Sequence, residues 1–341
     1  MRRLAVLAWI ALSIVSGAVE AHAQSTVAKS PGPVPAALRQ ALSLSPFYKK
    51  YIDAKGLAIL GSDKVSNAAL QEAAEIVDAM LGTRDDIRRA LIRNRVRVAV
   101  MAPAELTTDI PEHSDLTPKD YWDKRARGLG ATLARPASSC AEENLLNLPG
   151  DHYARESIAI HEFAHTIHIL GLNSIDSNFD RRLRTAFQHA REKGLWLNTY
   201  AGSNHAEYWA EAVQSYFDAN DANNPQHNDI DTREKLAAYD AEIFALVGEV
   251  FAKTSWRYVR YDMRHGRPSK DRVNIVIANL TDVEASIYWS GPAGPVLYRK
   301  LAPGESYEQQ TFVGHKWQAK IPGRTAIDFV APATNAPWNL K

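Results

Sequence analysis

The chain has 341 residues, of which 45% are hydrophobic and 9% aromatic, and these values are typical of a packed globular protein long enough for two domains. Its formal net charge is +1, which excludes a global field that would attract nucleic acid or an anionic membrane surface. Cys140 is the only cysteine, so an intramolecular disulfide is excluded and stability must come from a core of ordinary size.

The first 23 residues have the three parts of a secretory signal. Two arginines precede an apolar segment that ends near Val15, and a small-x-small cleavage site ends at Ala23. An uncleaved membrane anchor is the alternative, but the apolar segment is shorter than the roughly 20 residues that span a bilayer. We therefore expect export to the periplasm or the medium, with no stable membrane span after cleavage. Residues 24–44, which begin small, polar and Pro-rich, are expected to form a flexible leader.

Regular structure is expected from residue 45 onward. The apolar patterns of 57–62 and 95–102 predict strands, and the stretches 66–81 and 84–94 between them predict helices. Further along, helices are expected to dominate from Tyr153 to about Phe251.

Two charged stretches need no ligand to explain them. Asp109, Glu112 and Asp115 lie in a loop-rich segment; they could hold a cation, but turn and cap roles are the simpler interpretation. Residues 257–272 are rich in arginine and also contain acidic residues, so we interpret them as a solvated linker without an assigned partner.

A helix is predicted from Ser157 to Leu170, because the stretch lacks Gly and Pro and its apolar residues recur at helical intervals. His161 and His165 then lie one turn apart on one face, separated by roughly 6 Å along the axis, so both imidazoles can bind one ion. Glu162 is rotated by roughly 100° from His161, where a carboxylate can take a proton from the water that a hydrolytic zinc ion activates. The alternative is an amphipathic helix whose histidines are satisfied core or surface groups.

A third ligand must come from another part of the chain. His168 lies on nearly the same face, but three residues of one helix rarely surround one ion, so a merely polar role is the better interpretation. A second predicted helix carries Glu207 and Glu211 four residues apart on one face, and either could complete the site. Asn204 is a candidate N-cap that would place Glu207 in a capping box, a role that needs no metal. Two histidines and one glutamate would leave the fourth zinc position open for water.

The C-terminal part changes to short β-rich runs. Six strands are expected within 273–332, in VNIVIANLT, ASIYWSG, VLYRKL, SYEQQTF, HKWQAKI and TAIDFVA, with a type II turn in APGE. The fold class is therefore predicted to be an α+β domain over 45–256 followed by a small all-β sandwich domain.

The stretch HEFAH, followed by TYAGSNHAEYWAEAV, resembles the catalytic peptidase domain of anthrax lethal factor and its relatives. The match is close over the two helices and loose over 45–256. The resemblance implies a zincin-like metallopeptidase fold with one zinc ion per chain. It implies His161, His165 and Glu207 as zinc ligands, Glu162 as general base and acid, Tyr200 as the donor to the oxyanion, and Glu211 beside the ligands. The secretory signal means that the toxin's intracellular substrates are not expected here.

The run IANLT…IYWSG…LYRKLAPGESYEQQTFVGHKW resembles the β domain of the von Hippel-Lindau tumour suppressor. That family's helical adaptor segment is absent, so ubiquitin ligation is not implied. An aromatic-walled pocket captures hydroxyproline in that family, and aromatic faces suit a flat pyrrolidine ring. The matching positions here are Trp289, Tyr298, Thr311, His315 and Trp317. The resemblance therefore implies a ligand that contains proline or hydroxyproline.

Two function classes follow from these patterns. The first is an exported zinc-dependent metallopeptidase that acts on a peptide or protein substrate and uses its C-terminal domain as an accessory recognition module. The second is an exported binding or adhesion protein whose zincin fold has lost activity. The intact Glu162 favours the first class.

Overall fold

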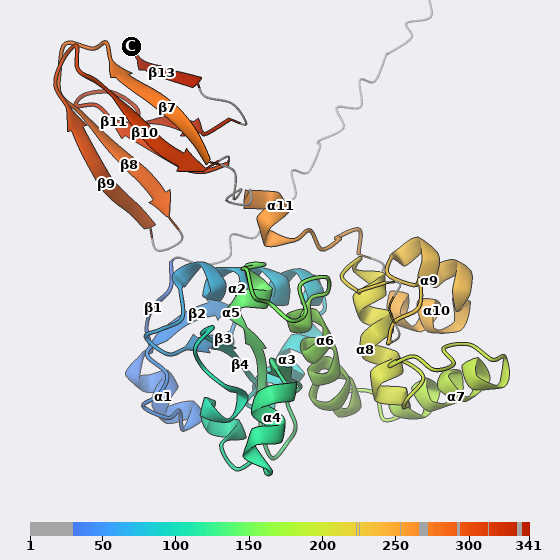
Figure 1. Ribbon diagram of the computed structural model, residues 1–341. Helices are drawn as coiled ribbons and strands as arrows, with labels where there is room; N and C mark the ends of the chain where they lie inside the picture. Colours follow the sequence, from blue (N-terminus) through green and yellow to red (C-terminus); the bar gives the residue numbers. More distant parts are fainter. Residues whose placement is uncertain are drawn as a thin grey trace, which may run out of the picture.

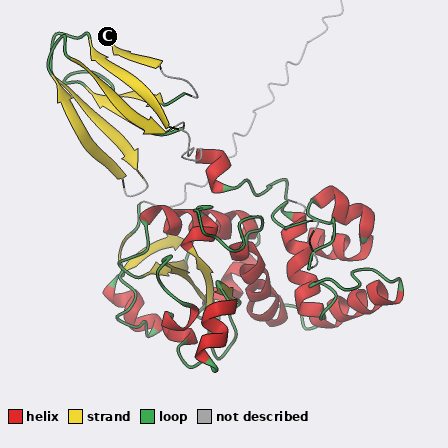
Figure 2. Ribbon diagram, in the orientation of Figure 1, coloured by secondary structure: helices red, strands yellow, loops and turns green. Residues whose placement is uncertain are grey.

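The computed structural model describes residues 30–341 except 223, 225, 253, 266–271, 292–293, 313 and 333–335. An α+β domain is followed by an all-β domain, which confirms the predicted fold class (Figure 1, Figure 2). The predicted signal, residues 1–23, lies outside the described residues. Within the described ranges, no helix is both long enough and apolar enough to cross a bilayer.

The first domain is built on a six-stranded mixed sheet with the order β1-β2-β3-β4-β6-β5. The predicted strands at 57–62 and 95–102 are β3 and β4, which run parallel to each other and to β6, whereas β2 and β5 are antiparallel to their neighbours. The strand bounds are β1 (Gly32–Pro33), β2 (Lys50–Ala54), β3 (Leu57–Gly61), β4 (Arg97–Met101), β5 (Gly128–Leu129) and β6 (Ala137–Ala141). The short strand β5 therefore forms one edge of the sheet.

Both predicted helices between β3 and β4 are present, as α2 (Asn67–Leu81) and α3 (Asp85–Arg93). Helix α2 begins where the Ser66 hydroxyl accepts a hydrogen bond from the Ala69 N–H, and it packs against β2, β3 and β4. Short helical segments follow: η1 (Thr107–Asp109), η2 (Pro111–His113), α4 (Lys119–Arg125) and α5 (Glu142–Leu145).

The second half of this domain is helical, as expected, and Figure 1 shows its helices grouped beside the sheet. Its elements are α6 (Ile158–Thr166), η3 (Ile167–Gly171), η4 (Leu172–Ser174), α7 (Phe179–Glu192), α8 (His205–Tyr216), α9 (Arg233–Tyr239) and α10 (Ala241–Val250). Helices α6 and α8 pack on each other, and α6 also packs on β6 and β5. The helix between the sheet and the helical group is thus the one that carries the HExxH motif.

The described part of the expected leader differs from a flexible segment. Strand β1 pairs with β2, and helix α1 (Ala36–Leu42) follows it. The Arg39 guanidinium donates hydrogen bonds to the backbone carbonyls of Ser45 and Tyr48, each at 2.7 Å. No residue of α1 is fully buried, but Leu38 and Leu42 are partly buried against a core cluster, so this packing, the backbone pairing and Arg39 hold the segment in place. A composition-based expectation could not detect such contacts.

The three acidic residues of the loop region are engaged with separate partners. Glu112 pairs with Arg97 at 2.7 Å, and Asp115 pairs with Arg135 at 2.9 Å. The Asp109 carboxylate accepts a backbone N–H at the start of η1. The Asp109 contact agrees with the predicted cap role, whereas Glu112 and Asp115 form ion pairs with arginines, and none of these contacts requires a shared cation.

The all-β domain is a sandwich of a three-stranded sheet, β10-β7-β13, and a four-stranded sheet, β12-β11-β8-β9. The six predicted strands are present, together with a seventh, β13, that lies beyond the expected end at residue 332. Strand β13 pairs parallel with β7 at the sheet edge, where Pro337 is tolerated. The bounds are β7 (Arg272–Asn279), β8 (Ala285–Gly291), β9 (Gly294–Leu301), β10 (Ser306–Phe312), β11 (Lys316–Lys320), β12 (Ile327–Val330) and β13 (Ala336–Leu340).

The turn between β9 and β10 has the conformation predicted for APGE. Gly304 has a φ of 78°, and the Glu305 N–H donates to the carbonyl oxygen of Ala302 at 3.0 Å, as in a type II turn.

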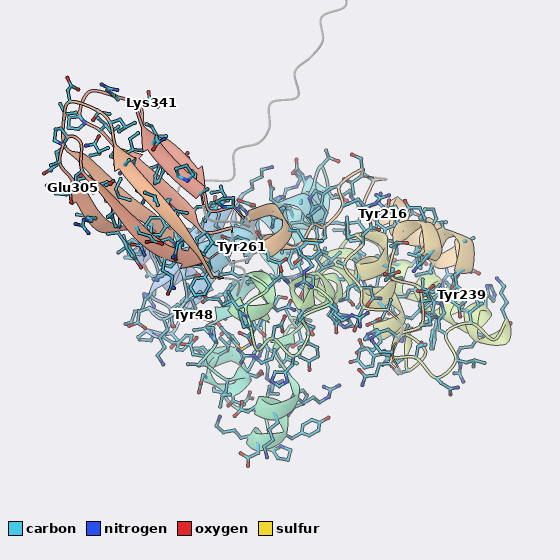
Figure 3. All side chains as sticks on the ribbon, turned by 45° about the horizontal axis from the view of Figure 1, so that its top comes forward. Tyr48, Tyr216, Tyr239, Tyr261, Glu305 and Lys341 are labelled. Atoms are coloured by element: carbon cyan, nitrogen blue, oxygen red, sulfur yellow. The ribbon has the colours of Figure 1, made fainter. Side chains whose placement is uncertain are left out.

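The expected linker, 257–272, is less solvated in its first part than its composition indicates. The Tyr258 side chain is buried, and its backbone N–H donates to the carbonyl oxygen of Phe217 at 2.8 Å. Helix α11 (Tyr261–His265) follows, and Figure 3 labels Tyr261 where the chain passes toward the β domain. Arg264 of this helix pairs with the buried Glu72 of α2, which fixes α11 on the first domain.

Candidate metal centre and catalytic residues

Helix α6 places the HExxH side chains. The Ser157 hydroxyl accepts the Ile160 N–H and begins the helix, while Phe163 and other apolar side chains of α6 are buried in the main core. The predicted helix continues past Thr166, but as the π-helical segment η3. His161 and His165 therefore project from the same face of regular α-helix, as predicted.

Helix α8 presents Glu207 to the two histidines. Asn204 is the N-cap as predicted, because its carboxamide oxygen accepts the N–H groups of Ala206 and Glu207 at 2.9 and 3.0 Å. The Trp209 indole N–H donates to the carbonyl oxygen of Ala164 at 2.9 Å and locks α8 onto α6. The Glu207 carboxylate faces the histidines instead of closing a capping box.

The His161, His165 and Glu207 side chains form a group that can hold one metal ion. The Nε2 atoms of both histidines lie 3.1 Å from Glu207 Oε2 and 3.1 Å from each other. Ligand atoms of a tetrahedral zinc ion, with bonds of about 2.0–2.1 Å, are separated by about 3.3 Å. The three donor atoms are thus close to the spacing that such an ion requires.

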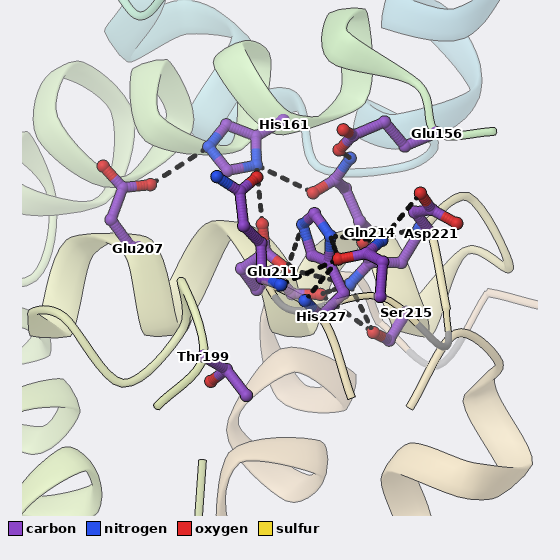
Figure 4. A network of polar contacts seen from close by, with 12 residues as sticks. Glu156, His161, Thr199, Glu207, Glu211, Gln214, Ser215, Asp221 and His227 are labelled. Atoms are coloured by element: carbon purple, nitrogen blue, oxygen red, sulfur yellow. Dashed lines mark hydrogen bonds and ion pairs between the residues drawn. The ribbon is translucent and has the colours of Figure 1, made fainter. Parts of the chain in front are cut away.

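The tautomer of His161 is fixed by Gln214, which sequence reasoning missed. His161 Nδ1 lies 2.7 Å from the Gln214 carbonyl oxygen, and the Gln214 amide nitrogen donates to Glu156 and to the Ser157 backbone (Figure 4). The orientation of the amide requires a proton on His161 Nδ1, so Nε2 is the nitrogen that is left to bind a metal. The sequence did contain a signal for Gln214, because Glu207, Glu211 and Gln214 are spaced so that they share one face of the helix.

Glu211 lies behind His161. Its Oε1 is 3.6 Å from His161 Nδ1, and its Oε2 accepts from Asn220 at 3.1 Å and lies 3.4 Å from His227 Nε2. Glu156, Glu211 and His227 form a second group whose ligand atoms could hold an ion. The pKa of His227 is raised by Glu211 despite its burial, so an ion pair accounts for this group without a metal.

The acidic surroundings change the proton affinity of His161. Burial alone would lower its pKa, but the hydrogen bond that the imidazolium donates to Glu207 and the nearby glutamate charges raise the pKa of His161 to about 10. Below that pH the metal-free imidazole is protonated, and a metal ion must displace the proton. Metal affinity is therefore expected to fall as the pH falls.

Glu162 lies beside the ligand group and touches the edge strand. Burial raises the pKa of Glu162, while the histidine charges and a hydrogen bond from the Gly130 N–H lower it. A Cβ at Gly128 would meet Glu162 Cγ at 2.9 Å, and one at Gly130 would meet His165 Cβ at 2.7 Å. The two glycines thus let β5 approach α6 closely enough for Gly130 to orient the carboxylate. Gly128 lies in β5 and Gly130 directly follows the strand, and this alternate spacing was the signal available in the sequence.

Tyr200 lies against the ligand group, and the backbone holds it there. Its N–H donates to the carbonyl oxygen of Gln226 at 2.8 Å, and its ring stacks on His161 with 6.1 Å between centroids. Burial and the Glu207 charge raise the pKa of Tyr200, although the Arg125 guanidinium, which hydrogen-bonds the phenol oxygen, opposes that rise. Tyr200 therefore keeps its proton at neutral pH and can donate it in a hydrogen bond.

His168, the third histidine of the helix, is directed elsewhere. Its Nε2 lies 3.1 Å from the Asp180 carboxylate of α7, and burial lowers the pKa of His168 to about 4. The prediction of a polar role outside the ligand set agrees with this contact.

The five residues singled out in the β domain lie in one cluster. The Trp317 indole N–H donates to the Thr311 hydroxyl at 3.1 Å, and His315 Nδ1 lies 3.1 Å from the same hydroxyl. The rings of Trp289 and His315 are 5.3 Å apart, and those of Tyr298 and Trp317 are 4.9 Å apart. Thr311 and Trp317 are buried, whereas the Tyr298 side chain is 51% exposed, so the cluster reaches the surface.

Comparison with known proteins gives a weak structural likeness. The sequence matches no protein-family model, and no curated protein matches it. Among solved structures, the chain is similar to the PRO-PRO endopeptidase PPEP-2 from Paenibacillus alvei, with 15% identity and a TM-score of 0.35 over 58% of this chain and 98% of that chain. At this level the likeness carries no functional conclusion, so the resemblances to lethal factor and to the von Hippel-Lindau β domain remain predictions.

Proposed function

We propose that the protein is an exported zinc-dependent metallopeptidase that hydrolyses peptide bonds with Glu162 as general base. The observation that carries this proposal is the convergence of the His161, His165 and Glu207 donor atoms with Glu162 beside them. A structural zinc site is normally closed by four protein ligands, whereas this group has three and leaves one position for water or substrate.

The residues of the site divide the chemistry among them. A zinc ion held by the three ligands would lower the pKa of water toward about 7 and polarise the scissile carbonyl. Glu162 accepts the proton of the attacking water and passes it to the leaving amine. Tyr200 donates a hydrogen bond to the oxyanion that develops on the carbonyl oxygen. Gln214 keeps His161 in the tautomer that ligation requires.

Metal analysis of the purified mature protein, combined with digestion of a diverse peptide library, tests this function. We expect about one zinc per chain and cleavage at defined positions that a chelator abolishes. Bound zinc without cleavage of any peptide would favour the alternative of an exported binding or adhesion protein.

Export is part of the proposal and rests on the N-terminal sequence alone. We expect the protein to leave the cytoplasm with Gln24 as its first residue, because the cleavage site ends at Ala23. N-terminal sequencing of protein from the periplasm or the medium checks this prediction. Recovery of a chain that still begins with Met1 would contradict it.

Tyr200→Phe should lower the hydrolysis rate by roughly 10² to 10³, as expected for loss of one donor to the oxyanion. The metal content should hardly change, because the phenol is not among the ligand atoms. Steady-state kinetics and metal analysis of the same preparation measure the two effects. An unaltered rate would reduce Tyr200 to a packing residue.

For the β domain we propose recognition of a peptide that contains proline or hydroxyproline. Support comes from the cluster of Trp289, Tyr298, Thr311, His315 and Trp317, which combines aromatic faces with a hydroxyl and an imidazole near the surface. Burial lowers the pKa of His315, so its imidazole is neutral at pH 7 and can accept or donate a hydrogen bond.

Titration of the full-length Glu162→Gln protein with matched proline and hydroxyproline peptides tests this second function without hydrolysis. We expect binding that His315→Ala weakens at least about tenfold, since an unpaired buried polar group costs on the order of 1–3 kcal/mol. His189→Ala, at an exposed histidine of α7, is the matched control. Absence of binding to both peptides would leave the β domain without this role.

A further inference from the structure

A cavity of about 560 Å³ opens beside the start of the edge strand β5. Its wall is made by the loop after β4, the end of α4, the residue before β5, helix α5 and the segment that leads into α6. The residues that matter for its chemistry are Leu106, Lys124, Arg127, Glu143, His152 and Tyr153.

The cavity adjoins the candidate catalytic residues through two short links. The Tyr153 hydroxyl donates to the backbone carbonyl of Arg125 at 2.6 Å, and the Arg125 guanidinium hydrogen-bonds the phenol oxygen of Tyr200. Arg127 directly precedes Gly128, where a Cβ would touch Glu162. An extended peptide that lies along β5 past Glu162 would therefore reach this cavity within a few residues.

The carboxylates in the cavity wall are already neutralised. Glu143 receives two hydrogen bonds from Arg127, at 2.6 and 3.0 Å, and both side chains are nearly buried. Asp123 pairs with Lys119 at 2.5 Å and also accepts from Thr108. Neither acidic group is left to attract a cation from a ligand.

The remaining polar groups of the wall are basic and exposed. Lys124 and His152 are both at the surface, and neither forms an ion pair with any residue that the structure describes. Leu106, Pro103 and Tyr153 add apolar surface to the same wall. An aliphatic stem that ends in a negative charge matches this combination of groups.

We infer that this cavity is a subsite that binds an acidic side chain, Asp or Glu, of the peptide substrate, with Lys124 as its charged partner and His152 as a second donor. This inference rests on the proposed peptidase function, because it names the substrate class of the same site. The attraction between an acidic side chain and Lys124 acts in a cavity that is partly open to solvent and away from the scissile bond. The subsite would therefore determine which peptides are preferred, and not the rate of the chemical step.

The test uses a peptide that the mature full-length protein cleaves, with Glu, Gln or Lys placed in turn at each position within four residues of the scissile bond. We expect one position at which Glu raises kcat/KM about 3- to 10-fold over Gln, the range of a partly exposed ion pair. In Lys124→Glu the preference at that position should reverse in favour of Lys. Lys193→Glu, on an exposed lysine at the end of α7, is the matched control and should keep the Glu preference.

Binding separates this inference from the proposed function. The Kd values of Glu-containing and Gln-containing libraries for the Glu162→Gln protein report the subsite without hydrolysis. If the native protein cleaved nothing but Glu162→Gln bound acidic peptides more tightly in a Lys124-dependent way, the peptidase proposal would fail and the subsite would stand. Cleavage with no Glu preference at any position, or with a preference that Lys124→Glu leaves unchanged, would overturn the subsite.

Discussion

Glu162→Gln is expected to lower kcat/KM for peptide hydrolysis by roughly 10³ to 10⁴, near the upper end of the effect of a positioned general base. The amide has the size of the carboxylate but cannot take the proton of the attacking water. Its carbonyl oxygen can still accept the hydrogen bond from the Gly130 N–H, so the local packing should persist. Steady-state kinetics with a peptide from the library measures the loss.

The same preparation supplies the control for this variant. Because Glu162 is not among the three ligand atoms, the variant should retain about one metal ion per chain and an unchanged thermal unfolding midpoint. Turnover close to that of the native protein would exclude Glu162 as the base. If the variant lost both the metal and the activity, Glu162 would be a metal ligand, which would contradict its proposed role as the base.

The predictions from sequence were strongest where a helical period, a cap and a chemical motif agreed. Helix α6 combines the HExxH spacing with a regular apolar face, and helix α8 begins at the predicted cap Asn204. Because helix geometry alone fixes how residues three and four apart share a face, His161 and His165 could be placed together without tertiary information. Glu207 lies beside these histidines only because α8 packs on α6. The sequence does not show that packing, so the choice of Glu207 depended on the family resemblance.

What could not be predicted depends on contacts between segments that are distant in sequence. Strand β5 has two residues, too few for a strand pattern, and it exists because it pairs with β6 and because Gly128 and the following Gly130 fit against α6. Arg125 reaches Tyr200 from a different part of the chain, and no local signal connects them. Strand β13 contains a proline that argues against a central strand, and only its position at a sheet edge makes the pairing acceptable.

Glu207→Ala and Glu211→Ala form a matched pair, because both glutamates lie on the same helix one turn apart. Glu207→Ala should remove one of three ligand atoms and lower zinc affinity by several orders of magnitude. Glu211→Ala should lower it far less, since its carboxylate lies behind His161 and contacts Asn220 and His227. Gln214→Leu should fall between them, with a loss of about 10- to 100-fold, because it removes the partner of His161 Nδ1.

Competition with a chelator of known affinity measures these differences, and the thermal midpoint with and without zinc shows that each variant folds. Zinc should raise the midpoint of the native protein and of Glu211→Ala but hardly that of Glu207→Ala, since stabilisation by a ligand follows its affinity for the native state. If Glu207→Ala bound zinc normally while Glu211→Ala did not, the ligand would be Glu211. The 3.1 Å separations between Glu207 and the two histidines would then describe a hydrogen-bonded cluster rather than a metal centre.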